Sequence, residues 1–261
     1  VYIPKIRTSA VSTDTQDHVT KAAKEMHLVD TVSYTGLEVG REYKLQAVLM
    51  DRDTNKPVQV GGKNVTSSLT FTPEKTNGTV EVHFDFDGSS LTSNALVVFE
   101  TMYTEGKEVA AHADIHDEEQ TIYIIGIKTH ARDFNTQINH TESKELAQIV
   151  DHVEYTSVLP GNEYVLHGVL MNKATGKPLL IDGKKVLATT TFTPTESAGS
   201  VDVVFKFDAS AIEGSTVVVF ETLTYRGVEV ASHQDIDDAE QTVYIPSVKT
   251  TAISGDTKDH M

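Results

Sequence analysis

One set of polar residues occurs twice in the chain with the same spacing. The first copy contains Glu100, His112 and Gln120, and the second contains Glu221, His233 and Gln241. Each Glu follows an apolar Val-Val-Phe run, the His comes twelve residues later, and the Gln eight residues after that. A carboxylate directly after such a run is expected near a core, where an unpaired charge is costly. Its recurrence with a His and a Gln indicates one chemical unit.

A Thr and an Asp recur in the same frame. They are Thr8 and Asp30 in the first copy, and Thr129 and Asp151 in the second. Thr8 lies on the expected first strand of its copy, and Gln120 directly precedes the expected last strand. First and last strands can lie side by side in a sandwich, so the Thr hydroxyl can face the Gln carboxamide.

A hydroxyl that attacks a carboxamide forms an ester and releases ammonia. The reaction needs a base for the hydroxyl, a donor for the developing oxyanion and an acid for the leaving amine. A His and two carboxylates are suitable groups. Two buried carboxyls close together cannot both ionise easily, so one stays protonated and can donate a hydrogen bond.

These residues are part of a long internal repeat. Counterparts such as Tyr34 and Tyr155, or Phe84 and Phe205, are always 121 residues apart, so the copies align without a gap. A period this long is a whole domain rather than a solenoid unit. The opening motif at residues 5–10 recurs at 126–131 and again at 247–252. We therefore expect domains at residues 1–125 and 126–246, and the first strand of a third repeat at 247–261.

Within a repeat the sequence signals are those of β-structure. Residues 79–86 alternate polar and apolar side chains at period two, and residues 200–207 largely do so. Pairs such as Asn77-Gly78 and Arg226-Gly227 mark turns. Seven or so strands per repeat predict an all-β chain of two tandem immunoglobulin-like (CnaB-like) sandwiches. Segments 19–25 and 114–119 could each hold a short helix or a loop. The very short linkers favour a rod over flexibly tethered domains.

The composition excludes several classes of function. The net charge of −16 over 261 residues makes nucleic acid an unfavourable partner. The chain has no Cys, which excludes disulfides, thiol catalysis and thiolate metal sites. It also has no apolar run long enough to span a membrane. No cofactor is expected.

The flanking motifs resemble the VaFE-type repeats of Gram-positive surface adhesins. They are the Phe-Glu strand, the Asp-x-x-Gln-Thr ending and the opening Thr-x-Ala, and they cover both repeats. Those domains form intramolecular Thr–Gln ester bonds autocatalytically. The resemblance implies that Thr8 and Thr129 are nucleophiles and that Gln120 and Gln241 are acceptors. It implies assisting roles for Asp30, Glu100, His112, Asp151, Glu221 and His233.

The same resemblance implies a mechanical function. The repeats would belong to the stalk of an extracellular, cell-wall-anchored adhesin and would resist force and proteolysis. Each domain would catalyse its own cross-link once, so the chain would not be an enzyme with turnover. Its partners would be neighbouring repeats of the same chain, and a host ligand would bind to another domain.

Five alternatives compete with this interpretation. An isopeptide bond would need a strand Lys, but Arg7 precedes Thr8, and Arg stays protonated. A hydrolase could use Thr8, His112 and Asp30 as a triad, and a ligand-binding module would show loops that differ between the copies. Each recurring polar residue could also be an ordinary strand or surface residue. A metal site would draw on an acidic turn that contains His112, Asp114, His116 and Asp117 in the first copy, and His233, Asp235, Asp237 and Asp238 in the second.

Overall fold

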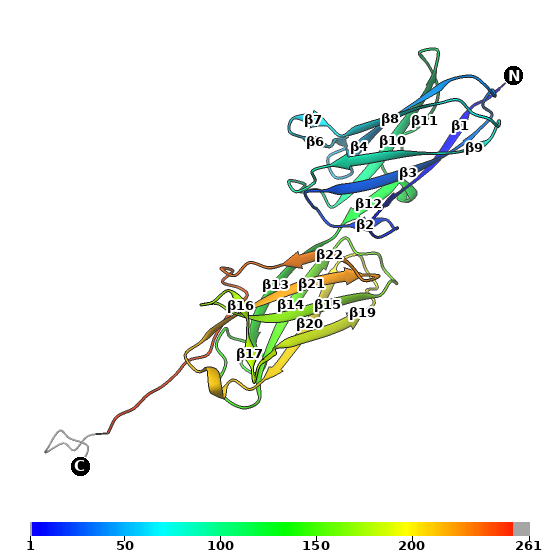
Figure 1. The fold of residues 1–261 in the computed structure, drawn as a ribbon. Coiled ribbons are helices and arrows are strands. Elements are labelled where there is room, and N and C mark those ends of the chain that lie inside the picture. The colour runs from blue at the N-terminus through cyan, green and yellow to red at the C-terminus, as the bar shows by residue number, and fades with distance from the viewer. Residues whose placement is uncertain (1, 253–261) are drawn as a thin grey trace.

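Two β-sandwiches follow one another along the chain in the computed structural model, which describes residues 2–252 (Figure 1). That part of the chain contains no α-helix, only two short 3₁₀ turns, η1 (Glu118–Gln120) and η2 (Ser210–Ile212). None of its helices is long and apolar enough to cross a membrane. The prediction of an all-β chain with two tandem immunoglobulin-like sandwiches is confirmed.

Repeat 1, the first of the two sandwiches, consists of a small sheet facing a larger one. The small sheet has the order β1 (Lys5–Ser12), β3 (Met26–Thr35), β9 (Gly78–Phe86). The larger sheet has the order β2 (Val19–Thr20), β12 (Thr121–Ile124), β10 (Ala95–Thr104), β4 (Tyr43–Asp51), β5 (Lys56–Pro57). In addition, β11 (Lys107–His112) pairs with β10, β8 (Thr66–Phe71) pairs with β4, and β6 (Gln59–Val60) pairs with β7 (Lys63–Asn64).

Repeat 2, the second sandwich, has the same two layers. Its small sheet has the order β13 (Gly126–Asp133), β14 (Ala147–Thr156), β20 (Gly199–Phe207). The larger sheet has the order β16 (Lys177–Pro178), β15 (Tyr164–Asn172), β21 (Thr216–Tyr225), β22 (Val228–His233). Here β19 (Leu187–Phe192) pairs with β15, β23 (Thr242–Tyr244) pairs with β21, and β17 (Leu180–Ile181) pairs with β18 (Lys184–Lys185).

The strand alternation places polar residues inside each core. Along β3, alternate side chains from Met26 to Tyr34 are buried, and Asp30 is one of them. On β10, Glu100 is as fully buried as the valines that precede it. Because successive strand residues point to opposite faces, the apolar neighbours that bury the rest of each strand bring these carboxyls inside with them.

The segments that could hold a short helix or a loop are mostly loop. Segment 19–25 begins with the two-residue strand β2 and continues as a loop, and segment 114–119 is a loop until η1 begins at Glu118. Residues 247–252 are exposed and form no strand. The rest of the expected third-repeat strand, residues 253–261, lies outside the described residues, so its assignment stays a prediction.

Candidate functional site

The five recurring residues of repeat 1 come from five separate elements. Thr8 lies on β1, Asp30 on β3, Glu100 on β10, His112 on β11 and Gln120 at the end of η1. In the β1–β3 ladder Asp30 is opposite Ala10, two residues from Thr8 on the same buried face. In the β10–β11 ladder Glu100 is opposite His112. The two layers therefore bring all five side chains together along the edge of the sandwich where β1 contacts β11 and η1.

The Thr and the Gln of repeat 1 are in direct contact. Gln120 Nε2 donates a hydrogen bond to Thr8 Oγ1 and lies 3.2 Å from Asp30 Oδ1, to which it also donates. Both Thr8 and Gln120 are buried. The carboxamide is thus held between the hydroxyl that could attack it and a carboxyl that faces its nitrogen.

Several buried polar atoms of this site have no hydrogen-bond partner. With both carboxyls ionised, these atoms are Asp30 Oδ2, both carboxyl oxygens of Glu100, and Gln120 Oε1, whereas a protonated Glu100 can hydrogen-bond to the adjacent Asp30 carboxyl. Buried polar atoms are normally paired, and leaving one unpaired costs free energy. Such a concentration of buried carboxyl and amide oxygens is typical of a functional site.

The environment favours the protonated form of the two buried carboxyls. Burial, followed by the adjacent Asp30 carboxyl, raises the pKa of Glu100 to about 11. Burial also raises the pKa of Asp30, against the opposing influence of Glu100 and His112. Glu100 therefore carries a proton at neutral pH and can act as a hydrogen-bond donor.

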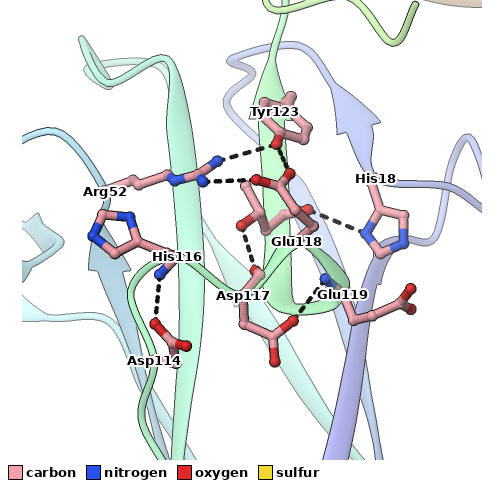
Figure 2. A network of polar contacts seen from close by, with 9 residues as sticks. His18, Arg52, Asp114, His116, Asp117, Glu118, Glu119 and Tyr123 are labelled. Atoms are coloured by element: carbon pink, nitrogen blue, oxygen red, sulfur yellow. Dashed lines mark hydrogen bonds and ion pairs between the residues drawn. The ribbon is translucent and has the colours of Figure 1, made fainter.

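The His of repeat 1 is oriented by a carboxylate that sequence reasoning did not assign to the site. His112 Nε2 lies 2.6 Å from Asp117 Oδ2. The other oxygen of Asp117 accepts the backbone N–H of Glu119 at 2.9 Å and so caps η1 (Figure 2). One carboxylate thereby fixes both the imidazole and the turn that carries Gln120. Its constant position, five residues after the His and three before the Gln in both copies, was the available signal.

Repeat 2 assembles the same groups. Gln241 Nε2 donates to Asp151 Oδ1 at 3.2 Å, and His233 Nε2 lies 2.7 Å from Asp238 Oδ2. Although burial opposes it, hydrogen bonds from the Glu240 backbone N–H and from His233 lower the pKa of Asp238. Burial and the neighbouring Asp151 raise the pKa of Glu221 well above its usual value, and burial raises the pKa of Asp151.

The nucleophile of repeat 2 differs in one respect. Thr129 is buried, and its Oγ1 lies within hydrogen-bond reach of the Glu221 carboxyl but receives no hydrogen bond from Gln241. In repeat 1 the corresponding hydroxyl accepts from the Gln. The residues that precede the two threonines, Arg7 and Lys128, are both exposed and point away from the core. Neither is placed as the amine of an isopeptide bond.

In the acidic turn that was considered as a metal site, a side-chain carboxylate is engaged by a backbone N–H of the same turn. Asp114 Oδ1 accepts the backbone N–H of His116 at 2.9 Å, and neither residue faces Asp117 (Figure 2). Nearby, Arg52 contacts both Glu118 and the Tyr123 hydroxyl, at 2.8 and 3.0 Å. Within residues 2–252, no group of three His, Cys, Asp or Glu side chains is arranged to hold a metal ion.

A surface cavity of about 480 Å³ opens beside the nucleophile of repeat 1. Seven residues line it: Arg7, Thr8, Ser9, Thr31, Ser33, Asp117 and Glu119. Thr8 itself is only 2% exposed, so it lies at the floor of this cavity. A small molecule such as ammonia can leave the site on this side.

Comparison with known proteins identifies both repeats. A family model described as "T-Q ester bond containing domain" matches residues 4–124 and 125–245. Comparison with curated protein sequences gives no match. Among solved structures, an adhesin from Mobiluncus mulieris containing intramolecular disulfide, isopeptide and ester bond cross-links is 14% identical, with a TM-score of 0.41 over 86% of this chain and 82% of that one. A putative beta-galactosidase from Bacteroides fragilis is 11% identical, with a TM-score of 0.32 over 94% and 36%.

Proposed function

The chain belongs to the family of T–Q ester bond containing domains, and on that premise we propose that each repeat closes its own Thr–Gln ester. The bond would join Thr8 to Gln120 in repeat 1, and Thr129 to Gln241 in repeat 2. The observation that carries the proposal is the contact of Gln120 Nε2 with Thr8 Oγ1, beside Asp30 in a buried site.

The first step is removal of the Thr proton. His112 uses Nε2 to bind Asp117, so Nδ1 is the ring nitrogen that remains to accept a proton. Asp117 stabilises the imidazolium that results, much as a buried Asp supports the His of a hydrolytic triad. The Thr8 oxygen then attacks the Gln120 carboxamide carbon and forms a tetrahedral intermediate with a negatively charged oxygen.

The two buried carboxyls serve the remaining steps. Glu100, which carries a proton because of its raised pKa, donates a hydrogen bond to the developing oxyanion. Asp30 faces the leaving nitrogen at 3.2 Å and supplies its proton. Oγ1–C bond formation and C–N bond cleavage release one ammonia. One proton leaves Thr8 and one reaches the nitrogen, so the charges balance once His112 and Asp30 exchange a proton.

Two features favour a cross-link over the hydrolase alternative. Gln120 occupies the position beside Thr8 where an external acyl group would have to bind. The released ammonia can leave through the cavity over Thr8, whereas the ester stays buried, away from water that would hydrolyse it. The reaction occurs once per domain and therefore gives no turnover.

We further propose that the repeats are stalk domains of a Gram-positive surface adhesin, outside the cell and attached to its wall. The ester joins β1, near the start of a repeat, to the turn before β12, near its end. A pulling force would pass through that bond and bypass the sheets. Such a bond protects the domain from unfolding under load and from proteolysis of the opened chain. A host ligand would bind elsewhere in the protein.

The test is to isolate the linked peptides. Protease digestion of the native chain should give one species that joins the Thr8 and Gln120 peptides, lighter by about 17 Da than their sum, since one ammonia is lost. Hydroxylamine cleaves esters but not amides, so it should separate the two peptides. A linked species that resists hydroxylamine would indicate an amide bond. Absence of any linked species would refute the proposed reaction.

The matched variants are Thr8→Ser and Thr8→Val. Serine keeps the hydroxyl, so the linked species should still form. Valine keeps the branched shape without the nucleophile, so the linked species should disappear from repeat 1 while repeat 2 retains its own. If the Gln120 peptide were instead linked to a residue with another hydroxyl, Thr8 would not be the nucleophile.

A further inference from the structure

One loop of repeat 1 makes polar contacts with one hairpin of repeat 2. The loop comprises residues 13–24 and is called here the joint loop; the hairpin connects β21 to β22 and is called the joint hairpin, residues 224–229. The Tyr225 hydroxyl donates to Asp17 Oδ2 at 2.7 Å, and Arg226 Nη2 lies 3.0 Å from the same oxygen. A second ion pair joins Lys21 Nζ to Glu229 Oε1 at 2.8 Å.

An apolar contact accompanies these polar ones. Val19 of the joint loop is fully buried and belongs to the core cluster of repeat 2. It lies on β2, which faces β22 across the boundary between the repeats (Figure 1). Thr15 Oγ1 donates to the Val19 carbonyl at 2.6 Å, and the Ile125 N–H donates to the Thr20 carbonyl at 2.9 Å. The connection between the repeats is therefore packed and hydrogen-bonded, unlike a free tether.

The charged part of the contact is partly removed from water. The Asp17 side chain is only 18% exposed, whereas Arg226 and the Lys21–Glu229 pair are more exposed. Burial opposes the shift, but the hydrogen bond from Tyr225 and the charge of Arg226 lower the pKa of Asp17. Burial and Asp17 together raise the pKa of Tyr225 to about 12. A charge-assisted hydrogen bond in such a setting is stronger than a solvated surface pair.

The corresponding loop of repeat 2 has the same backbone but different chemistry. The Ser12 N–H donates to the Asp17 carbonyl at 2.9 Å, and the Asp133 N–H donates to the Ile138 carbonyl at 2.8 Å. Gln16 and Gln137 both adopt positive φ, at 55° and 58°. Ile138 thus stands where repeat 1 has Asp17, and Glu142 stands where it has Lys21. At these two positions that loop offers neither an acceptor for a Tyr hydroxyl nor a cation for a Glu carboxylate.

The corresponding hairpin of repeat 1 differs in the same way. Thr104 and Glu105 stand where repeat 2 has Tyr225 and Arg226. Glu105 adopts φ 50° and Arg226 φ 51°, so the two turns share one backbone conformation. Against this hairpin, Asp17 would meet a carboxylate instead of a guanidinium, and like charges at such a distance repel. Among these two loops and two hairpins, therefore, only the joint loop of repeat 1 and the joint hairpin of repeat 2 carry complementary groups.

We propose that the joint loop and the joint hairpin form an order-specific docking surface, whose partner is the following repeat and which fixes the two repeats in one relative orientation. The contact requires neither ester bond, so it stands independently of the proposed reaction. Its consequence is that the pair transmits bending and twisting forces as one body. The residues of the joint loop and the joint hairpin then determine which repeat can dock after which.

Distances between spin labels test this proposal directly. The chain has no Cys, so two labels can be introduced without background. Lys63→Cys and Lys184→Cys occupy equivalent exposed positions on β7 and β18, one in each repeat. The doubly labelled chain should give one narrow distance peak in pulsed electron resonance. A broad distribution in the parent chain would overturn the proposal.

Two sets of substitutions test the cause of the fixed orientation. Asp17→Ala/Val19→Ser/Lys21→Ala should broaden the distance peak, whereas the same changes at the equivalent positions of repeat 2, Ile138→Ala/His140→Ser/Glu142→Ala, should leave it narrow. A peak that stays narrow with the first set would show that the linker alone sets the orientation, which would refute the proposal.

A second variant tests the same contact if the first set of substitutions prevents folding. Tyr225→Phe/Arg226→Glu keeps the ring that stacks on Tyr164 and introduces the residue found at the same positive φ in repeat 1. This hairpin should fold, and the distance peak should broaden because Asp17 then faces a carboxylate. An unchanged peak in this variant would contradict the assignment of Asp17, Tyr225 and Arg226 to the docking surface.

Discussion

The inner residues of the two sites are alike, and the outer residues are not. The distance from the Gln nitrogen to the Asp oxygen is 3.2 Å in both repeats, and the His–Asp distance is 2.6 Å in one and 2.7 Å in the other. On the outward faces of the same strands, Ser9 and Thr31 in repeat 1 correspond to His130 and His152 in repeat 2. The chemistry therefore depends on the inward positions, and the outward ones are free to vary.

The turn that presents the Gln is also held differently. In repeat 1, Arg52 bridges Glu118 and the Tyr123 hydroxyl (Figure 2). In repeat 2, Ala239 replaces the Glu, and Lys173 donates to Thr242 Oγ1 at 3.1 Å. Both arrangements nevertheless retain the carboxylate that caps the turn and binds the His. The comparison indicates that this carboxylate is required and that the surrounding ion pairs are replaceable.

The largest expected effect comes from removing one nucleophile. Thr8→Val should destabilise repeat 1 by about 4–5 kcal/mol, because the ester closes a loop of nearly the whole domain and the loop-entropy model assigns roughly this value. Thr129→Val should do the same to repeat 2 alone. Thermal unfolding of both variants, with Thr8→Ser as the control, measures this difference. Equal melting temperatures for all four proteins would contradict a stabilising bond in either repeat.

The next effect concerns the capping carboxylate. Asp117→Asn can still cap η1, since Asn is as good a cap as Asp, but it cannot stabilise a protonated His112. Ester formation in repeat 1 should slow by roughly 10²–10⁴-fold, the usual contribution of a general base. Mass spectrometry at intervals after refolding gives the rate. Glu119→Gln is the control on the same turn, and a full rate in Asp117→Asn would show that this residue only supports the fold.

A smaller effect is expected in the pH dependence of an uncross-linked domain. The pKa of Glu100 is about 11 in the folded domain, compared with 4.5 for an unperturbed Glu, so between these values the folded state keeps a proton that the unfolded state releases. Stability from this group is complete below pH 4.5 and declines as the pH rises. The melting temperature of Thr8→Val should fall over this range.

The control for that pH dependence is the double variant Thr8→Val/Glu100→Gln. It cannot titrate at this position, so its melting temperature should fall less steeply with pH. The difference between the two slopes isolates the contribution of Glu100 from that of other groups. Parallel slopes would contradict a protonated Glu100.

The smallest effect is expected on the outer face. His130→Ser/His152→Thr gives repeat 2 the outer residues of repeat 1, and we expect the ester to form as before. Burial raises the pKa of Asp151, and His130 and His152 oppose this, so their removal should raise it slightly further. The pH profile of ester formation in repeat 2 should shift modestly. Loss of the ester would show that the outer residues take part in the chemistry.

The sequence allowed prediction of what the two copies share. The sandwich fold follows from period-two alternation, and Thr8, Asp30, Glu100, His112 and Gln120 stood out because they recur with fixed spacing. The contact between His112 and Asp117 was not predicted, because it depends on the path of the turn between β11 and η1. The joint residues were not predicted either. Asp17 and Tyr225 are replaced by Ile138 and Thr104 in the other copy, so the repeat pattern could not reveal them. The catalytic roles and the domain boundaries stay predictions.

The mass of the intact chain tests the central claim most directly. Two ester bonds should lower it by about 34 Da from the value calculated for the sequence, because each condensation releases one ammonia of about 17 Da. Thr250 shares the Lys-Thr-x-Ala setting of Thr129 but lies in an exposed segment and not in a buried site, so it should stay unmodified. A loss of three ammonias would contradict that assignment of Thr250. A mass equal to the calculated one would contradict ester formation in both repeats.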